Sequence, residues 1–254
     1  MIINSHDLYV EQTGPQNGPA VVLLHHGLGS VRAWRGQIQA LAEAGHRVIA
    51  YDRWGYGGSD RRDGLDLPAF TTDVSDLGTL LDQLGIRRAA LVGHSDGGTI
   101  ALYYAARYPA RVRCLVTVAA HIYIEPKMEP AFVNLQESFK SDDRFRKGMK
   151  LAHGDKYESV FQHWFDGWYR IESLSWDLRS VLGSIKCPAL IVQGDEDEHA
   201  SPQHAIDIAE SIPGAELWII PGVKHMVPQE CTEAFNMKIV QFLKLNGVEK
   251  LAGK

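Results

Sequence analysis

With 254 residues, 45% of them hydrophobic and 22% charged, the chain has the composition of an ordinary globular protein, which excludes a disordered, collagen-like or coiled-coil architecture. Its net charge of −5, without a basic stripe, argues against a nucleic acid as its main partner. No apolar run reaches the roughly 18 residues of a membrane span. Residues 1–14 show no basic segment followed by an apolar stretch, so we expect no signal peptide. We also expect no membrane partner.

Short apolar runs alternate along the chain with longer segments of helical period. Six runs are predicted to be strands: 20–25, 48–51, 89–93, 115–119, 189–193 and 217–220. Helices are predicted at 68–84, where apolar residues recur at spacings of three and four, and at 99–108 and 232–245. The alternation predicts an α/β fold with a mostly parallel, eight-stranded sheet and helices on both faces. The runs at 2–3 and 8–11 are candidates for an antiparallel edge hairpin.

The alternation is interrupted between residues 122 and 183, where no strand-like run occurs. Trp164, Trp168 and Trp176 lie in this stretch, and charged residues are dense between 140 and 150. An aromatic-rich helical insertion between two strands predicts a lid, or cap, whose rings fill its own small core and line a cavity. We therefore expect residues 1–121 and 184–254 to form the core, and residues 122–183 to form the cap.

The strongest motif is Gly93-His94-Ser95-Asp96-Gly97, between a predicted strand and a predicted helix. Gly-x-Ser-x-Gly in this context is typical of a nucleophile elbow, a turn so tight that side chains beside the serine would collide with the backbone. The Ser95 hydroxyl would project from the carboxyl end of the sheet, over a helix N-terminus that can bind a developing oxyanion. The alternative interpretation is an ordinary glycine-rich turn.

A serine hydroxyl is a weak nucleophile and needs a base, which in turn needs an orienting group. His225 is the candidate base because it follows the last predicted strand, at the sheet edge where ligands gather in open α/β folds. His25 and His26 are interpreted as loop-shaping residues, and His94 is expected to point away from the serine. Five further histidines are interpreted as surface residues: His6, His46, His153, His163 and His204.

The orienting acid is expected after the preceding strand, where residues 194–199 read Gly-Asp-Glu-Asp-Glu-His. We choose Asp197, since Asp195 leaves the strand too early, and the chain order Ser…Asp…His agrees with the elbow. A metal site that also uses His199 and His204 is the alternative. It is disfavoured because the carboxylates are not spaced for one face, so we expect no metal.

A second oxyanion donor is expected in His26-Gly27-Leu28-Gly29, after the first long strand. Its glycines let the backbone approach a substrate closely, so the Leu28 N–H can act together with the Asp96 N–H. Neither this loop nor the glycines at 55–58 complete a dinucleotide or phosphate-loop pattern, and we expect no cofactor. The loop 52–59 is interpreted as structural, fixed by Asp52 and Arg53.

Taken together, the motifs at 26–29, 52–59, 93–97 and 194–197, with His225, resemble the α/β-hydrolase superfamily over nearly the whole chain. The resemblance implies Ser95 as nucleophile, His225 as base, Asp197 as orienting acid, and a cap inserted after the sixth strand. The Ser-Asp-Gly-Gly elbow and the segment 164–168 are similar to the biphenyl-hydrolase-like (valacyclovir hydrolase) branch.

The reaction expected from these residues is hydrolysis of a small-molecule carboxylic ester through an acyl-enzyme. Hydrolysis of carbon–carbon bonds and opening of lactones use the same triad and remain alternatives, as does a ligand sensor on the same fold. Epoxide and haloalkane hydrolysis normally need aspartate where this chain has Ser95. A cofactor-independent oxygenase is a remoter alternative.

Substrate contacts are expected from His26, His121, Trp164 and Trp168. The Asp96 carboxylate either pairs with a cationic group on the substrate or turns elsewhere, and we favour the second interpretation. The three scattered cysteines, Cys114, Cys187 and Cys231, are expected to be buried thiols of a reducing compartment, in a cytoplasmic monomer or homodimer.

Overall fold

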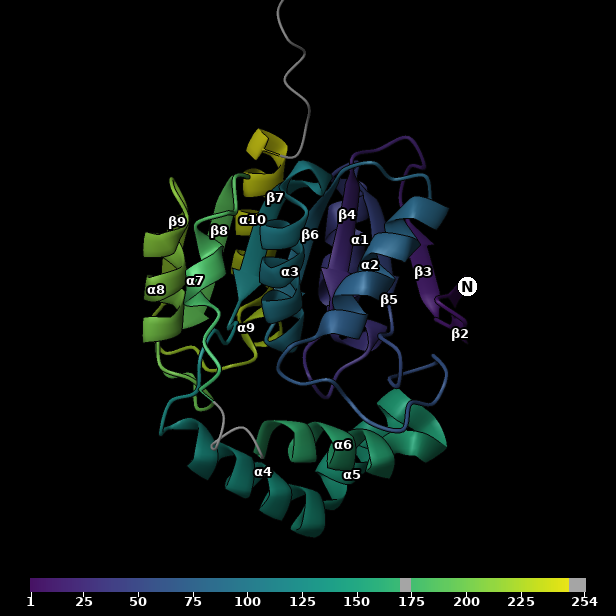
Figure 1. Ribbon diagram of the computed structural model, residues 1–254, viewed down its shortest axis with the longest axis vertical. Coiled ribbons are helices and arrows are strands. Elements are labelled where there is room, and N and C mark those ends of the chain that lie inside the picture. Colours follow the sequence, from purple (N-terminus) through teal and green to yellow (C-terminus); the bar gives the residue numbers. More distant parts are fainter. Residues whose placement is uncertain (170–174, 247–254) are drawn as a thin grey trace, which may run out of the picture.

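The computed structural model describes residues 1–169 and 175–246. At its centre lies a seven-stranded sheet with the order β3-β5-β4-β6-β7-β8-β9 (Figure 1). Its strands are β3 (Val10–Thr13), β4 (Ala20–Leu24), β5 (Arg47–Tyr51), β6 (Ala89–His94), β7 (Val112–Val118), β8 (Ala189–Gly194) and β9 (Glu216–Ile220). The edge strand β3 pairs with β5 in antiparallel orientation, and the other neighbouring strands pair in parallel. The predicted α/β architecture with a mostly parallel sheet is therefore confirmed.

The prediction of eight strands in this sheet is wrong for the described part of the chain, which has seven. β1 (Ile2–Ile3) and β2 (His6–Asp7) pair with each other as a separate hairpin. Their turn residues Asn4 and Ser5 have positive φ angles of 48° and 76°, so the chain reverses at once. Strands of two residues are too short to extend the main sheet, and β3 forms its edge instead.

Helices cover both faces of the sheet, as Figure 1 shows. One group consists of α1 (Arg35–Glu43), α9 (Val227–Glu230) and α10 (Thr232–Asn246). The group on the other face consists of α2 (Thr71–Gln83), α3 (Asp96–Arg107), α7 (Arg179–Leu182) and α8 (Gln203–Ser211). Along β4, Val22 and Leu24 pack in the cluster of α2 and α3, whereas Val21 and Leu23 pack in the cluster of α1 and α10. Burial on both faces explains why this strand is apolar throughout.

Three further helices lie beyond the end of the sheet at which the parallel strands finish (Figure 1). They are α4 (Met128–Ser141), α5 (Asp143–His153) and α6 (Tyr157–Tyr169), called here the α4–α6 layer. Phe139 of α4 stacks on Phe161 of α6 with ring centroids 3.9 Å apart, and Phe145 of α5 meets both rings edge-on. This aromatic cluster joins the three helices. No helix in the described residues is long and apolar enough to cross a membrane.

All three cysteines are free thiols. Cys114 and Cys187 are buried, and burial raises the pKa of Cys114 to about 12 and that of Cys187 to about 11. Both groups are therefore protonated at neutral pH, and they contribute packing rather than reactivity.

Candidate active site

Ser95 lies at the tip of a sharp turn between β6 and α3. Its φ of 54° and ψ of −121° are rare for a residue with a side chain, and its N–H donates to the Val118 carbonyl at 2.8 Å. A Cβ on Gly93 would lie 2.2 Å from the Gly97 carbonyl oxygen, and one on Gly97 would lie 2.1 Å from the Leu24 carbonyl oxygen. These contacts confirm the prediction that the turn requires glycine on both sides of the serine.

His225 and Asp197 form a buried hydrogen-bonded pair, with His225 Nδ1 2.8 Å from Asp197 Oδ2. The same carboxylate accepts the Gln193 side-chain amide at 2.7 Å and the N–H groups of His199 and Ala200 at 2.8 and 3.1 Å. These four donors fix the orientation of the carboxylate. The proton of a neutral His225 ring is then on Nδ1, which leaves Nε2 free to accept another.

Burial favours the neutral form of the His225 ring. Removal from solvent lowers its pKa well below the usual 6.5, and the neighbouring His199 ring, whose centroid is 4.6 Å away, lowers it further. The neighbouring His94 donates from Nε2 to the His225 carbonyl at 2.9 Å. Burial lowers the pKa of His94 to about 3, so its ring is neutral. His94 therefore turns to the His225 loop, which agrees with the expectation that it points away from Ser95.

A cavity of about 320 Å³ lies between the carboxyl ends of the strands and the α4–α6 layer. Eight of the nine predicted site residues line it: His26, Leu28, Ser95, Asp96, His121, Trp164, Trp168 and His225. The ninth, Asp197, does not line the cavity and lies behind His225. Phe132, Leu135 and Phe145 complete an apolar wall, so the cavity suits a ligand with a substantial apolar part.

The buried carboxylate of Asp96 binds the α4–α6 layer. Its Oδ2 accepts the Trp164 indole N–H at 3.2 Å, and its Oδ1 accepts the Trp168 indole N–H at 3.1 Å. The Arg53 guanidinium lies 3.5 Å from Oδ2. A Cβ on Gly27 would lie 2.0 Å from the Trp164 nitrogen, so this glycine makes room for an indole as well as for any substrate. Asp96, the residue after Ser95, thus joins the elbow to α6.

His121 lines the cavity and packs its ring against His225 and Trp168. Both of its ring nitrogens are buried and lack a hydrogen-bond partner among the described residues. The ring centroid lies 5.9 Å from that of His225 and 5.6 Å from that of Trp168. Burial lowers the pKa of His121 well below its usual value, so the neutral ring offers one donor and one acceptor. Since unpaired buried polar groups cost free energy, this ring is suited to a polar group on a ligand.

His153 of α5 holds the loop that contains Leu28. Its Nδ1 accepts the Gly57 N–H at 3.0 Å, so the proton of the neutral ring is on Nε2, which donates to the Leu28 carbonyl at 3.0 Å. Burial, aided by the charge of Lys156, lowers the pKa of His153 to about 4. Sequence reasoning missed this residue. The available signal was its spacing of four from the buried Met149, which places both on one face of α5.

The interpretation of the other histidines as surface residues is wrong for four of the five. Buried positions are held by His6, His46, His153 and His204, while His163 is partly exposed. His6 Nε2 lies 2.9 Å from the Asp76 carboxylate, and His204 Nδ1 accepts the Ile122 N–H at 3.2 Å. A histidine can be buried at low cost when long-range partners satisfy its ring, and such partners are not visible in the local sequence.

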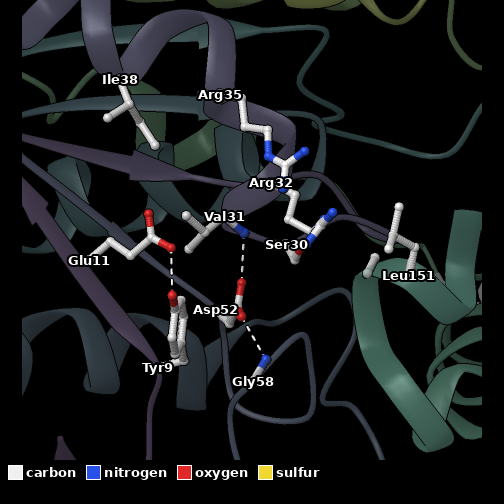
Figure 2. Close-up of a pocket in the computed structure, with 11 residues that line it drawn as sticks. Tyr9, Glu11, Ser30, Val31, Arg32, Arg35, Ile38, Asp52, Gly58 and Leu151 are labelled. Carbon is white, nitrogen blue, oxygen red and sulfur yellow. Dashed lines mark hydrogen bonds between the residues drawn. The ribbon is translucent and has the colours of Figure 1, made fainter.

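The loop after β5 is held by Asp52, as predicted. Asp52 Oδ1 accepts the Val31 N–H and Oδ2 accepts the Gly58 N–H, each at 2.6 Å (Figure 2). Arg53 also contacts this loop, since its guanidinium lies over the Tyr56 ring at 4.3 Å from the centroid, and it reaches Asp73 of α2 at 3.2 Å as well. It therefore links the elbow region to α2. Within the described residues, no three histidine, cysteine or acidic side chains are grouped so that they could hold a metal ion.

Several known proteins are similar to this chain over most of its length. A family model described as the alpha/beta hydrolase fold matches residues 19–152. The serine hydrolase BPHL of Homo sapiens is 32% identical over 95% of this chain and 84% of that protein. The bifunctional esterase/perhydrolase DCH of Acinetobacter calcoaceticus is 27% identical over 94% of this chain and 96% of its own. The solved enol-lactonase from Burkholderia xenovorans LB400 has a TM-score of 0.74 and 25% identity, covering 96% of this chain and 99% of that one.

Replacing Gly93 by alanine should destabilise the protein because the new Cβ would overlap the Gly97 carbonyl. We expect the free energy of unfolding to fall by about 1–3 kcal/mol, measured by denaturant titration. Gly148→Ala is the matched control, since a Cβ there meets open space within a helix, and it should leave stability unchanged or slightly higher. Equal stability of the two variants would contradict the close packing of the elbow.

The Asp96 carboxyl should titrate near pH 6. Burial raises its pKa from 3.8 to about 6, opposed by the charge of Arg53 and the two indole N–H groups. Protonation weakens the acceptor of Trp164 and Trp168, so tryptophan fluorescence should change with a midpoint near pH 6. The unfolded carboxyl ionises at lower pH, so this group favours the folded state most below pH 3.8, and the effect is lost as pH rises through about 6. Asp96→Asn should lack the fluorescence step; a step that persists in this variant assigns it elsewhere.

Proposed function

The chain belongs to the α/β-hydrolase fold family, and on that premise we propose that it is a serine hydrolase that cleaves a carboxylic ester of a small molecule through an acyl-enzyme. The observation that carries the proposal is that Ser95 and His225 line one cavity, while Asp197 holds the His225 ring from behind. A strained serine beside a neutral imidazole that a buried carboxylate orients is suited to nucleophilic catalysis.

In the proposed reaction, Ser95 Oγ attacks the ester carbonyl carbon while His225 Nε2 takes the hydroxyl proton. Asp197 keeps the ring in the required tautomer and stabilises the imidazolium. Collapse of the tetrahedral intermediate breaks the ester bond, and the leaving alcohol receives the proton from His225. A water molecule then attacks the acyl group on Ser95 by the same route and releases the acid.

The proposed oxyanion donors are the N–H groups of Leu28 and Asp96. Asp96 is the first residue of α3, and the first N–H groups of a helix lack acceptors within the helix. Leu28 is held through its carbonyl by His153, which limits movement of the loop. Loss of one such donor typically slows the reaction by about 100- to 1,000-fold.

We propose that the α4–α6 layer, within residues 122–183, acts as the cap and selects the substrate. Phe132, Trp164 and Trp168 face the cavity and would bury an apolar acyl or alcohol group. The fourth helix of this range, α7, packs against α3 and α8 and belongs by its contacts to the core. Opening of a lactone is the same reaction on a cyclic ester, and similarity to the enol-lactonase favours it as the second candidate.

The Asp96 side chain supports a substrate without a cationic group. Both of its oxygens already accept indole N–H groups, and Arg53 supplies a positive charge beside them. A substrate ammonium group would have to displace these donors from a buried carboxylate, which opposes its binding. The geometry is in line with our expectation that this side chain turns to other partners.

Ser95→Ala should reduce the hydrolysis of short p-nitrophenyl esters by about 10⁴-fold or more, because the acyl group then has no nucleophile to receive it. A fluorophosphonate probe should add its mass to the wild-type protein at Ser95 and not to the variant. Circular dichroism is the control for folding. Turnover that is undiminished in the variant would refute the assignment.

His121→Phe should act on substrates that carry a polar group near the ester. The change keeps a ring but removes both nitrogens, so we expect kcat/KM to fall about tenfold for such esters through loss of one hydrogen bond. Hydrolysis of p-nitrophenyl acetate, which has no such group, should be unchanged. His163→Phe, at a residue that does not line the cavity, is the control. An equal loss on both substrates would mean that His121 acts only through packing.

A further inference from the structure

A second cavity, of about 710 Å³, lies at the amino ends of the parallel strands, whereas Ser95 lies at their carboxyl ends. Residues at the starts of β4, β5 and β7 and in the loop before β6 form its walls. Four of these residues are arginines: Arg47, Arg87, Arg88 and Arg113. We call this site the arginine cavity. Its described lining contains no aspartate or glutamate.

The four positive charges have no counter-charge within the described part of the chain. Arg47 donates from two nitrogens to the Gln12 side-chain oxygen, at 3.2 and 2.7 Å, and Arg88 Nε donates to the Val112 carbonyl at 3.3 Å. Both acceptors are neutral, so they orient the guanidinium groups without neutralising them. Arg113 Nε is buried without a hydrogen-bond partner among the described residues.

Six other arginines in the described residues are paired with carboxylates. Arg53 pairs with Asp73 at 3.2 Å, and Arg111 pairs with Asp82 at 2.7 Å. The cavity drawn in Figure 2 also holds two arginines, Arg32 and Arg35, but Glu11 and Asp52 share its wall. The arginine cavity is therefore exceptional in a chain whose net charge is −5.

Like charges that line one concavity repel each other, and a concave wall concentrates their field. An anion from outside the chain relieves this repulsion. Guanidinium groups bind phosphate oxygens through paired N–H donors, and several of them around one cavity match an anion with more than one phosphate group. The volume also lies in the range of small-molecule sites, about 300–1,000 Å³.

We propose that the arginine cavity binds a small anion that carries two or more phosphate groups. A concave site of this volume favours a compact ligand over an extended nucleic acid or a membrane surface. The site lies at the amino ends of the strands and the proposed catalytic residues lie at the carboxyl ends, so the ligand is not the ester substrate. The inference holds independently of the reaction proposed for Ser95.

The test is calorimetric titration of the full chain with inorganic pyrophosphate at low ionic strength. We expect saturable binding to one site, and about tenfold weaker binding, or 1.4 kcal/mol, in Arg87→Gln. Arg87 is exposed and makes no hydrogen bond to a described residue, so its loss should not disturb folding. Arg144→Gln is the matched control, since it removes one exposed charge from α5, away from the cavity, and should leave the affinity unchanged.

Absence of saturable pyrophosphate binding would overturn the proposal. Equally weakened binding in Arg87→Gln and Arg144→Gln would also overturn it, because it would indicate a response to net charge alone. Citrate provides a second arm, and binding as tight as that of pyrophosphate would overturn the assignment to phosphate. Preference for a DNA duplex or for vesicles of anionic phospholipid, lost in Arg87→Gln, would assign the surface to a macromolecule and overturn the small-ligand proposal.

Discussion

The close contact between the elbow and the strands beside it determines where the reactive groups lie. At Gly93 and Gly97 the backbones approach so closely that no side chain fits, and the chain must turn with Ser95 in a strained conformation. The packing of the turn between a fully buried strand and a buried helix face maintains this strained conformation. His94, which precedes Ser95 in the chain, then hydrogen-bonds the carbonyl of His225. This bond links the turn that carries the serine to the loop that carries the candidate base.

Asp96 serves the same turn in two ways. Its N–H lies at the start of α3, where we propose that it binds an oxyanion, while its carboxylate accepts the indoles of Trp164 and Trp168. Movement of α6 is thereby coupled to the residue beside Ser95. His153 provides a parallel connection from α5 to Leu28. Both proposed oxyanion residues are thus in contact with the α4–α6 layer, and its seating bears directly on the catalytic geometry.

Sequence reasoning succeeded where the determining contacts are local. Strand runs, the elbow and the glycines around Ser95 follow from residues close together in the chain. Most candidate site residues came from motifs at strand ends, and Trp164 and Trp168 came from the aromatic-rich insertion. It failed where distant partners decide. Four buried histidines were assigned to the surface because partners such as Asp76 and Ile122 lie about 70 to 80 positions away. The additional contact of Arg53 with Asp73, 20 positions away, was not anticipated, and the two-residue strands β1 and β2 gave no sign that they pair only with each other.

The bond between the Asp96 carboxylate and the two indoles also limits how such a protein can be rebuilt. An α4–α6 layer transplanted from a relative without tryptophans at these two positions would leave a buried negative charge facing apolar side chains. A new layer would therefore have to bring its own donors, or the residue after the serine would have to change with it. The α4–α6 layer and the elbow are, in this chain, joined by these hydrogen bonds rather than independent modules.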